Sequence, residues 1–184
     1  MKKDDMIASG DYVADQYGQI YQLKEVSEEY DKYIDAEFYK EDQEVLYGDT
    51  ILVSTSETIE DLGHSCYYNR RDTGLLGGEQ LLLRPKSSNI HHKFLFYAST
   101  YFQNDLKKFA TGIKVYRFNI GDLKKIRMVI PPIKEQKEIL RKLDKEINTI
   151  NKLIEDKQKV IEELESYKKS LIYEYVTGKK TVWK

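Results

Sequence analysis

The stretch IPPIKEQKEILRKLDKEINTI, residues 130–150, decides how this chain is divided. Pro131 and Pro132 cannot extend a β-sheet, but proline suits the entry to a helix, where its missing N–H costs nothing. Glu135 follows in the first turn, where the helix dipole favours a carboxylate. Apolar residues then recur at spacings of three and four. The stretch therefore predicts that a β-rich segment ends near residue 130 and that a helix starts at residue 133.

This helix is predicted to run from residue 133 to residue 176, with Gly178 as its C-terminal stop. At ~1.5 Å per residue it would be about 65 Å long. Lys157 and Lys168 occupy two positions of its apolar seam. A seam of this length favours pairing with another helix over folding back on the preceding domain. The seam residues are Leu143, Ile147, Ile150, Ile154, Ile161, Leu164, Leu171 and Tyr175.

Upstream of the helix the sequence is β-rich. Short β-branched or aromatic runs, bounded by Gly, Asp, Asn or Pro, occupy residues 48–55, 64–69, 79–85, 115–120 and 126–131. Helical spacing of Phe and Leu predicts one helix over 91–110. We therefore predict an α+β fold: a small β-rich domain (1–132), a long C-terminal α-helix that pairs as an antiparallel coiled coil (133–178), and a tail (179–184).

Composition narrows the class of protein. With 184 residues, 40% hydrophobic and 33% charged, the sequence is typical of a soluble chain with one compact domain and an extension. No apolar run approaches the ~18 residues of a membrane span, and the charged start is unlike a secretory signal. The single cysteine, Cys66, excludes an internal disulfide and is consistent with a reducing cytosol. We expect a cytoplasmic protein with no membrane partner.

Charge is distributed unevenly along the chain. Residues 25–49 contain ten acids and two lysines, a net charge of −8, whereas residues 107–127 contain seven basic residues and one acid, a net charge of +6. An anionic partner such as DNA would be attracted to the second stretch and repelled by the first. The alternative is that both stretches are solvated faces.

No catalytic motif is found. The sequence has neither a GxxxxGK[ST] phosphate loop nor a GxGxxG turn after a strand. In the Asn/Asp-Pro-Pro-aromatic motif of amino-methyltransferases, the polar residue before Pro-Pro holds an exocyclic amine. Ile130 occupies that position here and has no polar group for this role. Glu135 and Lys137 superficially resemble the Glu-x-Lys end of a nuclease metal site. They lie at the start of a predicted helix, however, and not on a strand. Two further pairs lack a second metal-ligand pair at suitable spacing: His64 with Cys66, and His91 with His92. We expect a protein that is not an enzyme and that binds no metal or cofactor. The alternative that stays open is an enzyme whose cluster of polar residues cannot be recognised in the sequence.

Residues 130–144, together with SLIYEYVTGKK at 170–180, resemble the conserved segment of Type I restriction-modification specificity (S) subunits. The segments 46–55, 77–85, 94–100 and 112–132 also resemble that family's target-recognition domain in order and spacing. The signature residues are Pro131, Pro132, Glu135, Gln136, Ile139, Leu143 and Asp144.

The resemblance implies a sequence-specific DNA-recognition subunit that reads one half of a bipartite site on double-stranded DNA. It also implies docking of the methyltransferase and the restriction/translocase subunits of a Type I complex. Family members carry two recognition domains joined by two antiparallel helices, whereas this sequence is expected to have one of each and to lack the usual N-terminal segment. We therefore expect a half-subunit that forms a homodimer through the long helix, a truncated cassette from a recombining locus, or an excised piece. The alternative is a truncated coiled-coil regulator that binds no DNA and competes for the partner subunits.

The DNA-recognition hypothesis selects candidate residues. Lys and Arg contact phosphates, and side chains that reach base edges provide specificity. For each candidate the alternative is a solvated loop residue, and Gly112 is expected to serve a turn with positive φ. The candidates for DNA contact are Lys114, Tyr116 and Arg117; Tyr68, Asn69, Arg70 and Arg71; and Thr55, Ser56 and Thr58.

A second set of residues is expected at the entry to the long helix. Two prolines restrict the backbone there, Glu135 can hold N–H groups of the first turn, and the Gln136 amide can bridge to the domain or to a partner subunit. We expect this segment to act as an elbow and docking element. It comprises Pro131, Pro132, Glu135 and Gln136.

Overall fold

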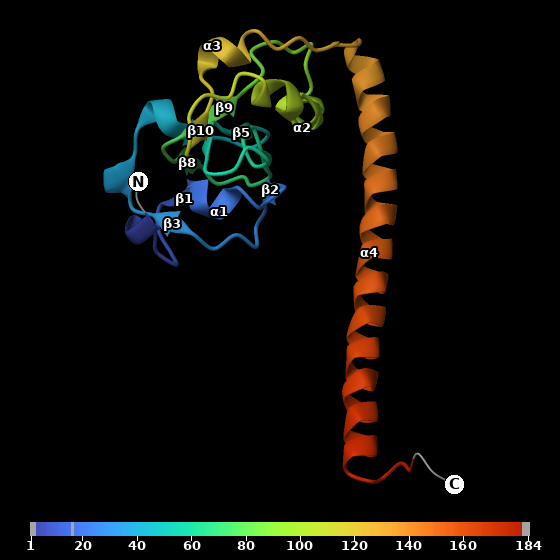
Figure 1. Cartoon of the computed structure of the whole chain (residues 1–184). Coiled ribbons are helices and arrows are strands. Elements are labelled where there is room, and N and C mark those ends of the chain that lie inside the picture. Colours follow the sequence, from blue (N-terminus) through green and yellow to red (C-terminus); the bar gives the residue numbers. More distant parts are fainter. Residues whose placement is uncertain (1–2, 16, 182–184) are drawn as a thin grey trace. The chain divides into compact units, whose positions relative to one another are not determined.

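The computed structural model describes residues 3–15 and 17–181, so the end of the expected tail, residues 182–184, lies outside the described residues. The chain forms two compact units, Met1–Lys137 and Glu138–Lys184. Figure 1 shows the elements of both units.

The described residues of the first unit form three small β-sheets. The first sheet has the order β3 (Tyr33–Ile34), β1 (Tyr12–Asp15), β8 (Gly74–Leu76), β4 (Glu44–Val45). The second has the order β2 (Glu25–Val26), β7 (Ser65–Tyr68), β5 (Thr50–Val53), β9 (Gln80–Leu83). The third pairs β10 (Tyr116–Arg117) with β6 (Thr55–Ser56). The β1·β8 and β2·β7 pairs are parallel and all other pairs are antiparallel.

Helices complete both units. The α-helices are α1 (Tyr17–Ile20), α2 (His92–Lys107), α3 (Ile120–Leu123) and α4 (Ile133–Val176). Single turns of 3₁₀-helix lie at Lys3–Asp5, Ala36–Phe38 and Glu41–Gln43. The α-helix predicted over 91–110 is confirmed as α2.

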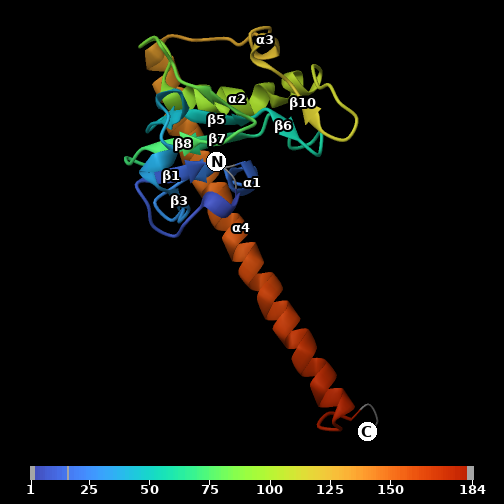
Figure 2. The same cartoon turned by 90° about the vertical axis from the view of Figure 1, so that its left-hand side faces the viewer.

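Strand β5 organises the core because both of its faces are buried. Successive side chains of a strand point to opposite faces. Ile51 therefore packs in a cluster with Val13, Val45 and other residues of β1, β2, β4 and β7, while Leu52 packs with α2 and with Phe118. The first unit is thus layered, with the first sheet on one side of the second sheet and α2 on the other (Figure 2).

Four of the five predicted β-runs contain strands, and the fifth is wrong. Residues 126–131 form no strand. Instead, Ile126 and Met128 pack, partly buried, against the cluster that contains Leu52. An extended segment with alternating apolar residues can bury every second side chain without pairing to a neighbouring strand. The alternating pattern alone therefore does not establish a β-strand. The two-residue strands β2, β3 and β4 are too short to produce such a pattern.

The long helix has the predicted bounds, since α4 runs from Ile133 to Val176. Two residues past its end, Gly178 has a φ of 71°, and the Gly178 N–H donates to the Tyr175 carbonyl at 3.3 Å. Within the second unit the seam is largely exposed, with Ile154 at 60% and Leu164 at 61%. In the part of the chain that the structure describes, no helix has both the length and the apolar composition of a membrane span.

Candidate nucleic-acid interface

The third sheet brings together candidate residues that lie far apart in the sequence. Thr55 pairs with Arg117 and Ser56 pairs with Tyr116. Thr111 extends the pairing, since its N–H donates to the Arg117 carbonyl and the Arg117 N–H donates to the Thr111 carbonyl, both at 3.0 Å. Residues 111–117 therefore form a hairpin beside β6. We call residues 55–58 and 111–117 the ribbon site; β6 and β10 lie at one end of the first unit in Figure 2.

The tip of the hairpin, residues 112–115, projects into solvent. Gly112 has a φ of 114°, and a Cβ atom there would lie 2.0 Å from the Val115 carbonyl oxygen, so the turn requires glycine. This confirms the expected role of Gly112. Lys114 is exposed, and Ile113 is exposed to 93%. The tip thus presents an apolar side chain next to a cation.

Side chains of the ribbon site differ in their access to solvent. Arg117 is exposed and Tyr116 is half-buried. Thr55 and Ser56 are buried, at 7% and 2% exposure, so they support the hairpin rather than face solvent. Thr58 is exposed, and its Oγ1 donates to an Asp61 carboxylate oxygen at 2.6 Å. Of the sequence candidates at this site, Lys114, Arg117 and Thr58 are the most accessible to a partner.

The basic stretch 107–127 surrounds the hairpin in sequence, but its cations are not equivalent. Lys108 pairs with Asp105, and Lys125 pairs with Asp122 at 2.8 Å while lying 4.9 Å from the centroid of a phenylalanine ring. Among residues 3–15 and 17–181, no carboxylate forms an ion pair with Lys114 or Arg117. These two cations are therefore available to an anionic partner.

The other loop of candidates, Tyr68 to Arg71, lies at the opposite end of β5. Thr50 is opposite Tyr67 and Leu52 is opposite Ser65 in this antiparallel pair. Tyr68 consequently lies beyond the start of β5, whereas Thr55 lies beyond its end. At ~3.3 Å per residue the two are separated by roughly 20 Å along the strand. The structure thus separates the two groups of candidates.

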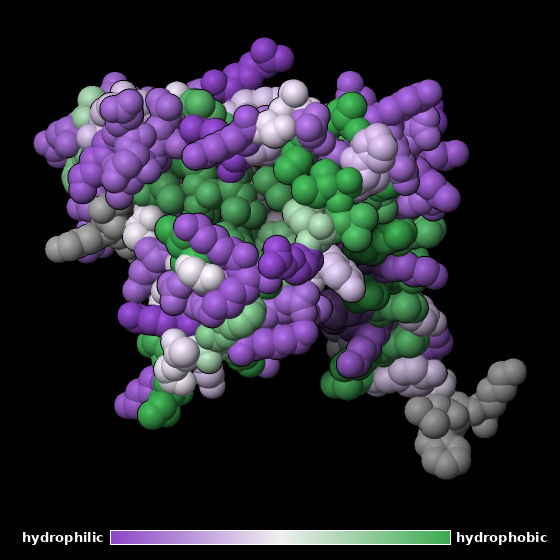
Figure 3. All heavy atoms as spheres, turned by 90° about the horizontal axis from the view of Figure 1, so that it is seen from above, coloured by the Kyte–Doolittle hydropathy of each residue, from purple (hydrophilic) through white to green (hydrophobic). Residues whose placement is uncertain are grey.

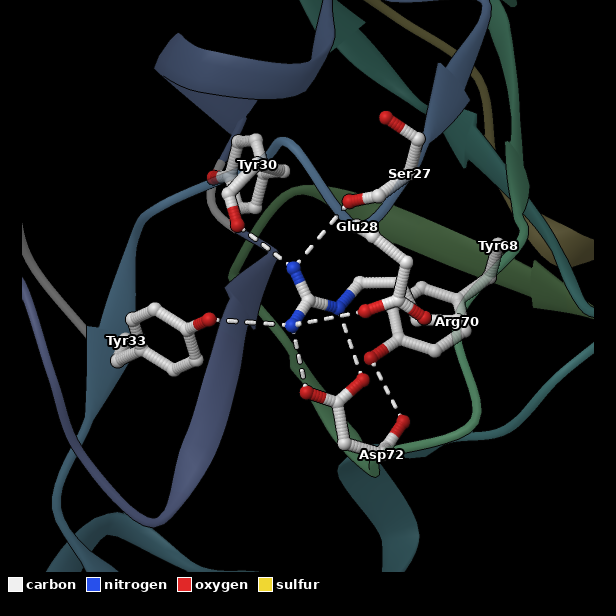
Figure 4. A network of polar contacts seen from close by, with 7 residues as sticks. All are labelled: Ser27, Glu28, Tyr30, Tyr33, Tyr68, Arg70 and Asp72. Atoms are coloured by element: carbon white, nitrogen blue, oxygen red, sulfur yellow. Dashed lines mark hydrogen bonds and ion pairs between the residues drawn. The ribbon is translucent and has the colours of Figure 1, made fainter.

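Within that loop, the placement of Tyr68 and Arg70 does not support the prediction that they contact DNA. Arg70 is 3% exposed; its Nε and Nη2 donate to the two carboxylate oxygens of Asp72 at 2.8 and 2.6 Å (Figure 4). Its other N–H groups donate to the Ser27 and Tyr30 carbonyls and to the Tyr33 hydroxyl. Asn69 and Arg71 are exposed and remain candidates.

The same polar network accounts for Tyr68, which is fully buried. Its hydroxyl donates to the Asp72 carbonyl at 2.9 Å, and burial raises the pKa of this hydroxyl. Hydrogen bonding from the Arg70 guanidinium lowers the pKa of the Asp72 carboxyl. Buried polar groups must find partners, and here Arg70 ties the loop at 27–33 to the end of β7. Asp72, two residues after Arg70, was the sequence signal for this structural role.

A buried carboxyl that the sequence analysis did not single out belongs to Asp15, on β1. It is fully buried, and within residues 3–15 and 17–181 no hydrogen-bond partner reaches either carboxylate oxygen. Burial raises its pKa well above the ordinary value, although the charge of Arg70 opposes this. A Cβ atom on Gly74 would lie 2.3 Å from the Asp15 Oδ2, so glycine makes room for this carboxyl.

The expected elbow has a defined internal contact. Gln136 is fully buried, and its Oε1 accepts a hydrogen bond from the His91 N–H at 2.9 Å. Its Nε2 donates to the Asn89 carbonyl at 2.7 Å and to the Pro131 carbonyl at 2.8 Å. The first turn of α4 is thereby fastened to the loop before α2. Pro132 and Glu135 are exposed on this segment, where docking of a partner subunit stays a prediction.

Next to this contact lies an open hollow of about 370 Å³ between the loop at residues 85–92 and the start of α4. Lys86, Lys137, His91 and His92 are among its lining residues. Burial and the neighbouring cations lower the pKa of His91. Among the described residues no three His, Cys, Asp or Glu side chains are grouped so that they could hold a metal ion.

The outer face of the segment that follows α3 is partly apolar. Figure 3 views the molecule from the side on which α3 lies in Figure 1, and hydrophobic groups show between hydrophilic ones on that face of the first unit. Val129 is exposed to 85% and Ile130 to 48%. These apolar residues lie outside the ribbon site.

Comparison with known proteins places the chain in one family. Residues 1–163 match the family described as Type I restriction modification DNA specificity domain. Two proteins of Methanocaldococcus jannaschii are similar in sequence: the one described as the MjaX type I restriction enzyme specificity subunit, 27% identical over 135 residues, and the MjaVIII specificity subunit, 34% identical over 96 residues. The matches cover 73% and 51% of this chain, but only 30% and 22% of those relatives.

Two solved structures share the fold. One, from a study of complex assembly and conformational transition of the type I R-M system, matches with a TM-score of 0.72 at 16% identity and covers 95% of this chain and 40% of that chain. The other is the S subunit of a Type I restriction-modification system from M. genitalium, with a TM-score of 0.50 at 17% identity, covering 86% of this chain and 38% of that chain.

Proposed function

Because the chain belongs to the family of Type I restriction-modification DNA specificity domains, we propose that it is a non-catalytic DNA-recognition element that reads one half of a bipartite site. In this role it binds double-stranded DNA through the first unit and docks the methyltransferase and restriction subunits. It would itself supply no catalytic group, metal or cofactor. The family match over residues 1–163 is the observation that carries the proposal.

The ribbon site is the part of the first unit best suited to DNA. It offers two cations without carboxylate partners among the described residues, Lys114 and Arg117, on a hairpin whose backbone is held at Thr111. The acidic stretch 25–49 includes β2, which pairs with β7 near Tyr68 and so lies toward the other end of β5. A polyanion would therefore be attracted to one end of the unit and repelled from the other.

Helix α4 is proposed to pair with the α4 of a second copy. Its seam residues are exposed within the second unit, and burying them against a partner helix would remove them from water. A homodimer with a twofold axis presents two identical recognition units, so it would read an inverted repeat. The antiparallel arrangement is the one that the family resemblance implies.

A second apolar row supports docking of further subunits on the same helix. Leu153, Val160 and Tyr167 recur every seven residues, each one position before a seam position, and each is about half exposed. A two-helix coiled coil buries a narrow seam, so these side chains would remain in water in a simple pair. They are suited to a helix from another subunit.

The proposal is tested by selecting duplexes from random-sequence DNA with the purified full chain, and then measuring affinity for the selected duplex at several salt concentrations. We expect an inverted-repeat motif with a spacer, and an affinity that falls as salt rises. A chain that dimerises or binds a Type I methyltransferase subunit but enriches no motif would instead be a coiled-coil regulator, and the proposed DNA recognition would be wrong.

A further inference from the structure

The most exposed apolar side chain of the ribbon site is Ile113, at 93%. Single exposed apolar residues are common on protein surfaces and need no explanation by themselves. The position of Ile113 is what distinguishes it. It lies at the tip of a hairpin, next to exposed Lys114, in a part of the chain where the net charge is +6 over residues 107–127.

The hairpin is stiff enough to position this side chain. Its base is closed by two backbone hydrogen bonds between Thr111 and Arg117, and the Thr111 hydroxyl adds a third bond to the Arg117 carbonyl at 3.2 Å. β10 is paired with β6, and the Phe118 N–H donates to the Ser54 carbonyl at 3.1 Å. An exposed side chain on a preorganised element loses less conformational freedom on binding than one on a loose loop.

The size and chemistry of the hairpin fit the major groove of DNA. The major groove admits a two-stranded β-ribbon, and it is where the C5-methyl group of thymine is presented. Apolar side chains recognise thymine by packing against this methyl group. Lys114 and Arg117 follow Ile113 in the same hairpin and could contact phosphates while the tip enters the groove.

We propose that Ile113 is a specificity-determining residue that contacts a thymine methyl group in the major groove. The inference rests on the proposed function, because it requires that the ribbon site binds DNA. It adds a role to that function: Lys114 and Arg117 provide affinity that depends little on sequence, whereas Ile113 provides the preference for an A·T pair at one position of each half-site.

The test uses the full chain and a duplex selected from random-sequence DNA by the wild-type chain. Each thymine of the selected half-site is replaced in turn by uracil, which keeps the base pair and lacks only the methyl group. Affinities are measured for the wild type, for Ile113→Ser and for Val129→Ser. Val129 is a matched control because it is a β-branched residue exposed to 85% outside the ribbon site. Thermal unfolding of each variant checks that the fold is retained.

At one thymine position the wild type is expected to bind the thymine duplex about fourfold more tightly than the uracil duplex, as one buried methyl group contributes ~0.8 kcal/mol. Ile113→Ser should bind both duplexes equally, and Val129→Ser should keep the fourfold preference. If Ile113→Ser selects the same motif and discriminates thymine from uracil as the wild type does, the inference is wrong while DNA recognition stands. If the wild type selects no motif at all, both the proposed function and this inference fail.

Discussion

The Oε1 atom of Gln136 accepts a hydrogen bond from the His91 backbone N–H at 2.9 Å, so the first turn of α4 is bonded to the residue that caps α2. Gln136 uses its amide N–H groups as well, on the Asn89 and Pro131 carbonyls. A fully buried amide with these three bonds joins the entry of α4 to the entry of α2, and each bond lost would leave a polar group without a partner.

Replacing Gln136 with Ala should lower the free energy of unfolding by about 1–3 kcal/mol, because backbone groups of His91, Asn89 and Pro131 lose their partner. Urea denaturation followed by circular dichroism measures the change. The control is Glu135→Ala at the exposed neighbouring position, which should change the stability little. Equal stability of the two variants would show that the Gln136 contacts contribute nothing measurable.

Helix pairing predicts the effect of charges placed in the seam. Ile147→Lys combined with Ile154→Lys should convert a dimer into monomers, because two buried ammonium groups would lack partners in the pair. Sedimentation measures the mass at micromolar concentration. Asn148→Lys with Ser166→Lys adds the same charge away from the seam and should leave the dimer intact. A wild-type chain that sediments as a monomer would contradict the pairing.

The Arg70 network predicts that two adjacent arginines differ in their effect on stability. Arg70→Ala should lower the free energy of unfolding by roughly 2–4 kcal/mol, because it removes five hydrogen bonds of a buried guanidinium. Exposed Arg71→Ala should lower it by less than about 0.5 kcal/mol.

The contribution of the Arg70–Asp72 pair to stability should depend on pH, because the pKa of Asp72 is lowered in the folded state. The stabilisation is present above the ordinary carboxyl pKa and is lost as the pH falls through the lower pKa of the folded state. Urea titrations at neutral and acid pH should therefore show a smaller Arg70→Ala effect in acid.

Buried Asp15 predicts a pH dependence of the opposite sign. Its pKa is raised in the folded state, so its contribution to stability is fully present below the unfolded value of 3.8 and is lost as the pH rises through the folded value. Asp15→Asn, which cannot ionise, should therefore unfold at a higher urea concentration than the wild type at about pH 8, with a gap that narrows toward about pH 4. Exposed Asp42→Asn serves as the control and should show no such trend; a constant gap for Asp15→Asn would refute the prediction.

Phosphate contacts by the ribbon site predict a change in salt dependence. Lys114→Gln with Arg117→Gln should weaken DNA binding and reduce the slope of log K against log salt by about 2 for each recognition unit bound, given ~0.9 per phosphate contact. Fluorescence anisotropy with a labelled duplex at several salt concentrations measures both quantities. Lys32→Gln with Lys40→Gln makes the same charge change in the acidic stretch and should leave the slope unchanged. An unaltered slope in the ribbon variant would show that these two cations remain solvated and do not contact phosphates.

The helical part of the chain was predictable because its signals are local. Pro131 and Pro132 limit the backbone before α4, the seam repeats along one face, and Gly178 adopts the positive φ that ends the helix. Helix hydrogen bonds join residues four apart, so a short stretch of sequence contains all the partners it needs. The pairing of this seam with another helix is a property of an assembly and stays a prediction.

The positions of the candidate site residues were decided only by tertiary structure. The sequence alone marked Thr55, Arg70 and Arg117 with equal weight as loop or strand-end residues. β-Sheet pairing then joined Thr55 to Arg117, which lie far apart in the chain, while the same strand placed Arg70 at its other end. Strands pair through backbone hydrogen bonds, which are the same for every residue type, so the sequence does not specify a distant partner strand. The burial of a charge likewise depends on the acids and carbonyls that the fold assembles around it. The sequence therefore determined the helix and the family, and the folded sheets determined which charges face solvent and which hold the core together.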